Sequence, residues 1–270
     1  QLIDTIEDGA VLSKYHASLE SFCQGNSDVF AEKEQLKQEI AKLKQEKEKF
    51  FSVVSFWLGS PLNSLKMLST MLTNDAANMD KTMMLEFIKH LHTQILKLHQ
   101  LMGNLITWAD LEVNNFRFQP ANVVLHKLVK DLLLNHQEHA TKKGISLQQE
   151  IAEDICVVAD EEALRKVIDN LLSNAIKFTT KGGKVEISAQ KEGQKVKIRV
   201  KDTGIGMGKA KIAAIFNTER KSTQKGTANE EGFGIGMPLV KQLLKLHHTE
   251  VEIDSDRGAG CTVSFQLDLA

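Results

Sequence analysis

The hydrophobic pattern of this chain changes its period between residues 114 and 120, and the change divides the chain into two structural types. Before it, apolar residues recur every three or four positions, as they do along one face of a helix. After it, short strand-like runs alternate with helical patterns, and most of the 17 glycines lie in this half. The sequence therefore predicts long helices first and then an α/β sandwich with glycine-rich loops.

The first half predicts a helical hairpin. Apolar residues recur at alternating spacings of four and three from Leu36 to Trp57, with Lys47 as the one polar member. This heptad seam is typical of a parallel coiled coil between two copies, although a solvated helix packed on its own domain has the same pattern. A turn is predicted at 74–78 and a second helix at 80–113. Two such hairpins from two chains form a four-helix bundle.

The first segment whose residues could bind a ligand lies within a helix predicted at 161–178. Asn170 and Asn174 are four residues apart and therefore share one face of this helix. Their amide oxygens are hard, neutral ligands suited to Mg²⁺, and Lys177 one turn later can reach phosphate oxygens. Taken alone, two asparagines and a lysine are more often an exposed polar face.

Two glycine-containing segments follow. Asp202 comes directly after a predicted strand, where its carboxylate can accept a hydrogen bond from an adenine amino group. Gly204 and Gly206 beside it let the backbone approach the ring. The glycine run at 232–236 precedes a predicted helix, whose N-terminal N–H groups can bind phosphate. Each segment is weak by itself, and neither has the spacing of a P-loop or a Rossmann fingerprint.

In this order and at these separations, the three segments resemble the N, G1 and G2 boxes of sensor histidine kinases. Residues 215–217 resemble the F box, and 258–262 resemble the closing G-x-G-x-T element. The resemblance implies ATP and Mg²⁺ as cofactors, and a mobile lid over ATP at about 207–232. The nucleotide-binding residues that it implies are Asn170, Asn174, Lys177, Phe178, Asp202, Gly204, Gly206, Gly232, Gly234, Ile235, Gly236 and Thr262, of which Asn170 and Asn174 hold the metal.

The resemblance also implies the fold and its division. We expect an α+β protein, in which a helical hairpin forms a dimeric four-helix bundle and is followed by an α/β sandwich ATP-binding domain of the Bergerat type. The expected divisions are an N-terminal helical segment at 1–25, for which the end of an upstream domain is one interpretation, the signalling helix and hairpin at 26–115, and the ATP-binding domain at 116–270.

Residues 50–63 resemble the phosphoacceptor box of the same family, but its reactive positions are replaced. Phe56 stands in the place of the histidine, Trp57 in that of the acid, and Gly59 in that of the base. Phenylalanine has no nucleophile and tryptophan no base, so self-phosphorylation at this position is excluded by chemistry. No catalytic residue of this box is intact. The histidines of the second predicted helix are not followed by the expected acid and are more often surface or packing residues.

Three functions remain open from the sequence. The first is the cytoplasmic portion of a two-component histidine kinase homologue that dimerises and binds Mg-ATP but acts as a pseudokinase toward its own hairpin. The second is a kinase that phosphorylates a histidine of a partner in trans. The third is a non-catalytic interaction module without nucleotide binding. The expected partners are a second copy or a related kinase, and a response regulator.

Composition excludes several other classes. A net charge of -1 gives no electrostatic footprint for nucleic acid. No apolar run reaches the roughly 18 to 20 residues of a membrane span. Three widely separated cysteines predict neither a disulfide framework nor a zinc site, and they favour a reducing, cytoplasmic location. Because the chain begins with glutamine, we expect it to be a fragment of a longer protein, in which any membrane anchor or sensor would lie upstream.

Overall fold

A computed structural model describes residues 13, 16, 33–41, 44–45, 48, 51–52, 54–55, 58–59, 61–74, 79–112, 116–216, 224–230, 232 and 234–270. The chain divides into two compact units, 1–56 and 57–270, which are described separately. In the first unit residues 33–41 are helical and exposed. Three residues on which predictions rest, Lys47, Phe56 and Trp57, lie outside the described residues.

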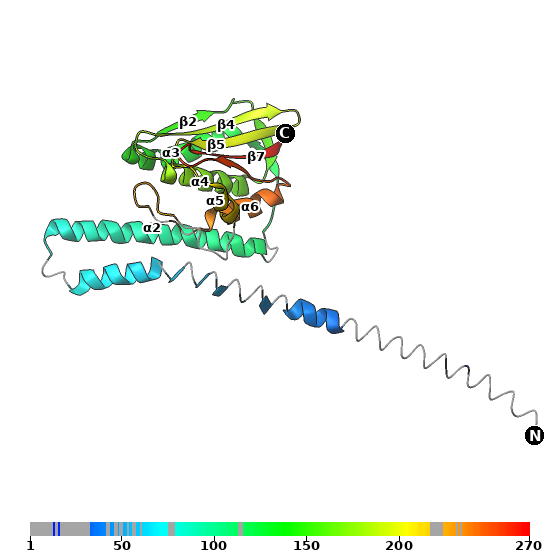
Figure 1. The fold of residues 1–270 in the computed structure, drawn as a ribbon, viewed down its shortest axis with the longest axis horizontal. Helices are drawn as coiled ribbons and strands as arrows, with labels where there is room; N and C mark the ends of the chain where they lie inside the picture. Colours follow the sequence, from blue (N-terminus) through cyan, green and yellow to red (C-terminus); the bar gives the residue numbers. More distant parts are fainter. Residues whose placement is uncertain are drawn as a thin grey trace, which may run out of the picture. The chain divides into compact units, whose positions relative to one another are not determined.

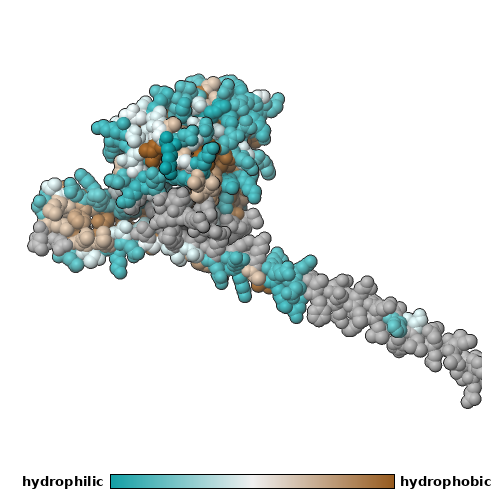
Figure 2. Space-filling model, in the orientation of Figure 1, coloured by the Kyte–Doolittle hydropathy of each residue, from teal (hydrophilic) through white to brown (hydrophobic). Residues whose placement is uncertain are grey.

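The second unit begins with the two predicted hairpin helices. Residues 61–74 are helical, and α2 spans Lys81–Glu112, close to the predicted bounds. Helix α2 begins after Asp80 because the Asp80 carboxylate accepts a hydrogen bond from the backbone N–H of Met83 at 2.8 Å. Figure 2 shows apolar residues gathered on the hairpin surface near the start of α2. None of the helices in the described ranges combines the length and apolarity that crossing a bilayer requires.

Residues 116–270 form an α/β sandwich, as predicted (Figure 1). The strands are β1 (Ala121–Val124), β2 (Ser146–Glu150), β3 (Cys156–Ala159), β4 (Lys184–Glu192), β5 (Lys195–Asp202), β6 (Glu252–Ser255) and β7 (Cys261–Leu269). The described strands make one seven-stranded sheet in the order β1-β3-β7-β5-β4-β2, with β6 paired to β7. Only β2 and β4 pair in parallel; the other strand pairs of this sheet are antiparallel.

Helices cover one face of this sheet. They are α3 (Leu125–Lys143), α4 (Glu161–Phe178) and α6 (Gly236–Leu246), with the short α5 (Lys209–Ala214) beside them. Along β5, Val196, Ile198 and Val200 are buried, while the residues between them are more exposed. This alternation places one side of the strand against the helices and the other toward solvent. The core therefore lies between α4, α6 and the central strands.

Asp160 fixes the start of α4. Its Oδ1 accepts from the backbone N–H of Ala163 at 2.9 Å, which satisfies a free donor of the first helical turn. Its Oδ2 accepts from the backbone N–H of Gln119 at 2.8 Å, and its own N–H donates to Nε2 of His247 at 3.1 Å. One residue therefore connects the start of α4 with the segment that enters the domain and with the end of α6.

The segment that enters the domain differs from the prediction. Residues 116–118, whose alternating Phe-Arg-Phe sequence predicts a short strand, have no regular secondary structure. The Phe116 N–H donates to the oxygen of Asp110 at 3.1 Å, and the Phe118 N–H donates to the oxygen of Phe116 at 3.1 Å. The backbone is therefore satisfied by local turns, and it does not join a ladder.

Candidate functional site

Helix α4 carries the first group of predicted site residues on one face. Asn170, Asn174 and Lys177 are half-buried and line a single cavity. The Asn170 amide donates from Nδ2 to the backbone oxygen of Lys166 at 2.8 Å, which leaves Oδ1 facing the start of α6. A Cβ on Gly236 would lie 2.7 Å from that oxygen. Amide oxygens on one helix face, beside a lysine, fit a magnesium-bound phosphate group.

Asp202, at the end of β5, lines the same cavity. Its side chain is buried, and its Oδ1 accepts from the backbone N–H of Gly204 at 2.8 Å. Burial raises the pKa of this carboxyl, and hydrogen bonds from the backbone amides of Gly204 and Cys261 offset only part of that effect. A buried, anchored carboxylate is an acceptor with few competing water molecules, which suits recognition of an adenine amino group.

The turn after β5 packs directly on the end of α4. A Cβ on Gly204 would collide with the carbonyl group of Phe178, and the next N–H, that of Ile205, donates to the same carbonyl oxygen at 3.2 Å. Gly206 has a φ of 61°, a conformation that glycine adopts readily. Of these two glycines Gly206 lines the cavity, whereas Gly204 packs against the Phe178 carbonyl outside the cavity lining.

Sequence reasoning missed an apolar surface beside Asp202. Val200, Ile205, Ile253 and Val263 line the cavity together with Met207. Such a surface is suited to the faces of a purine ring. Strand periodicity contains a signal for it, because Val200 and Asp202 are two positions apart and therefore point to the same side of β5.

The position assigned to Thr262 needs correction. Cys261, and not Thr262, lines the cavity among the described residues of β7. Cys261 pairs directly with Asp202 in the β5–β7 ladder, while Thr262 pairs with Lys201. Because successive residues of a strand point to opposite faces, Thr262 faces away from the wall that carries Asp202. The adenine contact that the resemblance implied for Thr262 is therefore not supported.

The glycine run forms another wall of the cavity. Gly232, Gly234, Ile235 and Gly236 all line the cavity, and α6 begins at Gly236. Ile235 is 2% exposed, and its carbonyl oxygen accepts from the N–H of Leu239 at 3.1 Å. Its side chain anchors the run in the core, while the glycines around it present backbone to the cavity.

Two lysines flank the ring of Phe178, which also lines the cavity. The Nζ atoms of Lys177 and Lys211 lie 5.0 and 5.2 Å from the ring centroid. Burial lowers the pKa of Lys211, whose ammonium group donates to the side-chain oxygen of Gln224. Positive charge is therefore concentrated around this aromatic ring, where an anionic ligand is favoured.

Comparisons with known proteins find relatives along most of the chain. Residues 159–270 match the family described as histidine kinase-, DNA gyrase B-, and HSP90-like ATPases. The adaptive-response sensory kinase SasA of Rippkaea orientalis is 31% identical over 256 residues, covering 88% of this chain and 65% of SasA. The first curated relatives are longer proteins, of which this chain spans between 42% and 66%.

Solved structures share the fold. The histidine kinase AdeS of Acinetobacter baumannii aligns with a TM-score of 0.64 at 16% identity, over 78% of this chain and 96% of AdeS. The histidine kinase ThkA, solved in complex with the response regulator protein TrrA, aligns with a TM-score of 0.58 at 18% identity, over 79% of this chain and 60% of that one. Both alignments extend over the hairpin helices as well as the α/β sandwich.

Proposed function

We propose that this chain, whose residues 159–270 match the histidine kinase-, DNA gyrase B- and HSP90-like ATPases, is a sensor histidine kinase homologue that dimerises and binds Mg-ATP but does not phosphorylate its own hairpin at the usual position. The observation that carries the proposal is the cavity, which a buried carboxylate, two asparagines and a lysine line together. The described walls of the cavity contain the carboxylate, amide and lysine groups that a nucleotide needs, whereas Phe56 replaces the nucleophile of the phosphoacceptor box.

Different residues of the cavity contact different parts of the nucleotide. Asp202 accepts the hydrogen bond from the adenine amino group, and the apolar residues around it contact the ring. Lys177 and the backbone of the glycine run bind the phosphate oxygens, aided by the N-terminus of α6. The oxygens of Asn170 and Asn174 would hold Mg²⁺, which neutralises phosphate charge when it is bound.

The fate of the bound γ-phosphate follows from the replaced box. Phe56 offers no nitrogen to attack phosphorus, and Trp57 offers no carboxylate to take a proton. Bound ATP therefore works as a ligand that stabilises one arrangement of the protein. Phosphate transfer to a histidine of a partner chain requires the same intact cavity. An experiment therefore has to distinguish this transfer from a role of ATP as a ligand alone.

The hairpin supports dimerisation. Its described residues expose large apolar side chains, among them Met67, Met71, Met83 and Ile88, each at least 40% accessible. Exposed apolar groups on paired helices fit burial against a second hairpin. Residues 26–115 would form this dimerisation part and 116–270 the ATP-binding part. A response regulator is the partner we propose, because the ThkA structure pairs a kinase of this fold with one.

The test measures nucleotide binding and phosphate transfer on the same samples. Calorimetry with Mg-ATP should give saturable binding, while incubation with γ-labelled ATP should leave no acid-labile label on the protein. A double variant, Phe56→His with Trp57→Glu, restores the acceptor and reports whether the bound ATP is competent for transfer. Absence of binding at millimolar nucleotide contradicts the first half of the proposal. Label on the unmodified chain contradicts the second half, and label on a co-incubated partner hairpin supports the trans kinase.

A further inference from the structure

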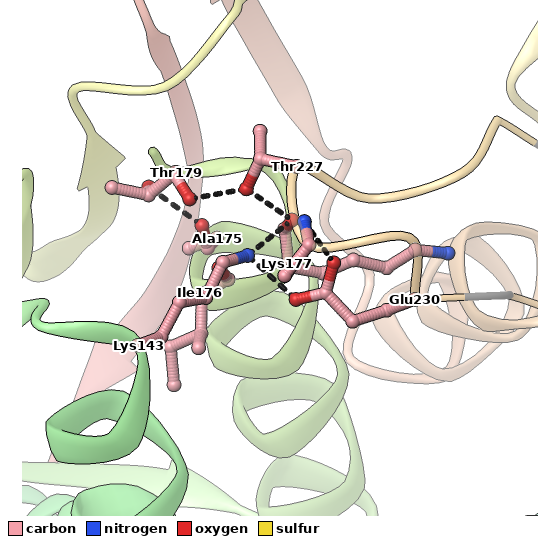
Figure 3. Close-up of polar contacts among 8 residues, drawn as sticks. Lys143, Ala175, Ile176, Lys177, Thr179, Thr227 and Glu230 are labelled. Carbon is pink, nitrogen blue, oxygen red and sulfur yellow. Dashed lines mark hydrogen bonds and ion pairs between the residues drawn. The ribbon is translucent and has the colours of Figure 1, made fainter. Parts of the chain in front are cut away.

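The C-terminal end of α4 has an unusual set of partners. The last carbonyl oxygens of a helix have no hydrogen-bond partner within the helix. Here the carbonyl oxygens of Ile176 and Lys177 accept hydrogen bonds from a lysine of another helix. The Lys143 ammonium, at the end of α3, donates to these two oxygens at 2.8 and 2.7 Å (Figure 3). Its third hydrogen bond goes to Oε1 of Glu230 at 2.6 Å. The three donors of this ammonium group are therefore all used.

Thr227 completes the same arrangement. Its N–H donates to the oxygen of Lys177 at 3.1 Å, and its hydroxyl donates to the oxygen of Thr179 at 2.6 Å (Figure 3). Together with the Ile205 bond to Phe178, each carbonyl from 176 to 179 has a donor. Residues 226–230 belong to the segment expected as a mobile lid, yet they are fixed on the end of α4. We call the contacts of Lys143, Thr227 and Glu230 with this helix end the clasp.

Glu230 is the centre of the clasp on the loop side. Its Oε2 accepts from the N–H of Ala228 at 2.8 Å, and its backbone oxygen accepts from the N–H of Gly226 at 2.7 Å. Burial would raise the pKa of Glu230, but hydrogen bonds from Lys143 and backbone amides, with the charge of Lys143, lower it overall. The side chains of Lys143 and Glu230 are only 8% and 19% exposed, so this ion pair is largely shielded from solvent.

The clasp borders the phosphate end of the cavity. Ala228, Asn229 and Glu230 line the cavity next to Lys177. The loop approaches Lys177 so closely that a Cβ on Gly226 would lie 2.7 Å from its Cγ. On its other side, the Lys177 ammonium lies against Gly232 of the glycine run. The position of Lys177 is therefore set by the clasped loop and the glycine run together.

We propose that Lys143 is a positioning residue for nucleotide binding. It holds residues 226–230 on the end of α4, and it thereby keeps Lys177 and Asn229 in position to contact the phosphate groups of a nucleotide. The inference rests on the proposed function, because it concerns the phosphate end of the same cavity. Lys143 itself does not line the cavity in the described structure, so it acts through the loop. The clasp then governs the extra affinity that phosphates give and leaves the purine end unaffected.

The test compares ligands that share adenine and differ in phosphates. Calorimetry with adenosine, ADP and ATP, in magnesium, is performed on the unmodified chain, Lys143→Met and Thr227→Val. We expect both variants to bind ADP and ATP more weakly by on the order of tenfold or more, because the phosphate-binding groups lose their fixed positions. Adenosine affinity should stay unchanged. Thr227→Val breaks the same docking without removing the ion pair, so the test does not depend on one variant.

Lys142→Met is the matched control. Lys142 is the adjacent lysine, but it is 71% exposed and pairs with Glu138 on the surface of α3, so its removal should change no affinity. Glu230→Gln retains acceptor and donor groups without the charge, and we expect a smaller loss than for Lys143→Met. If folded variants keep the ATP-to-adenosine affinity ratio, or lose all ligands equally, the positioning role is wrong. If the unmodified chain binds neither adenosine nor ATP, the proposed function fails instead.

Discussion

Replacing Asp202 by asparagine should weaken ATP binding without unfolding the domain. The carboxylate has one oxygen, Oδ1, fixed by the Gly204 N–H at 2.8 Å. An asparagine that keeps this bond places its NH₂ group where the second oxygen was. The adenine amino group then meets a donor in place of an acceptor. A hydrogen bond to a charged group contributes about 1.5–3 kcal/mol, which corresponds to a loss of about 10- to 150-fold in affinity.

The assay is calorimetry with two nucleotides in magnesium. ITP lacks the amino group of ATP, so the unmodified chain should prefer ATP, and Asp202→Asn should lose that preference. Asp154→Asn, at an exposed aspartate that pairs with Lys191 on the surface, is the matched control and should leave the preference for ATP unchanged. Thermal unfolding should move little, because the asparagine relieves a buried charge while keeping the turn bonded. If Asp202→Asn still prefers ATP to ITP, the purine is not held by this residue and its orientation in the cavity is different.

Three further predictions concern the same walls. The pKa of Asp202 is raised above 3.8, the ordinary value of an aspartate, and protonation of its carboxylate removes the acceptor for the adenine amino group. ATP affinity should therefore begin to fall on acidification before the pH reaches 3.8. Calorimetry across acidic pH checks this, and a constant affinity down to that pH contradicts it. Gly204→Ala should abolish ATP binding and lower the melting temperature, because its Cβ would collide with the carbonyl of Phe178, whereas Gly103→Ala has open space around it and should be tolerated. Ile235→Ala should lower the free energy of unfolding by about 2–5 kcal/mol, as measured in denaturant; a loss below about 1 kcal/mol would show that this side chain does not anchor the glycine run.

The sequence predicts those parts of the fold whose signals are local. The bounds of α4 agree with the predicted 161–178, because a capping aspartate, two acidic residues in the first turn and a continuous apolar face all coincide there. The sequence carries no clear signal for β1 and β3, since each has only four residues and a run that short carries little periodicity. β1 forms by pairing with β3, and β3 pairs in turn with β7, the last strand of the chain.

The candidate site shows the same division. Most predicted nucleotide residues come together in one cavity because they lie at ends of elements that meet there. The exchange of Thr262 for Cys261 was missed because a difference of one residue along a strand reverses the face, and only the register with β5 settles it. The ion pair of Lys143 and Glu230 joins residues 87 positions apart, and no local pattern relates them.

The capping aspartate at the start of α4 has a mechanical consequence. Asp160 accepts one bond from the helix and one from Gln119, in the stretch that leads out of the hairpin. The same helix carries Asn170 and Asn174 in its later turns, so the entering chain is attached to one end of a stiff rod whose other end faces the cavity. A displacement of that segment either lengthens the hydrogen bonds of Asp160 or tilts α4. A displacement that begins upstream can therefore reach the two amides through the Asp160 carboxylate, as well as through the hydrogen bond of Lys166 on α4 to Thr107 on α2.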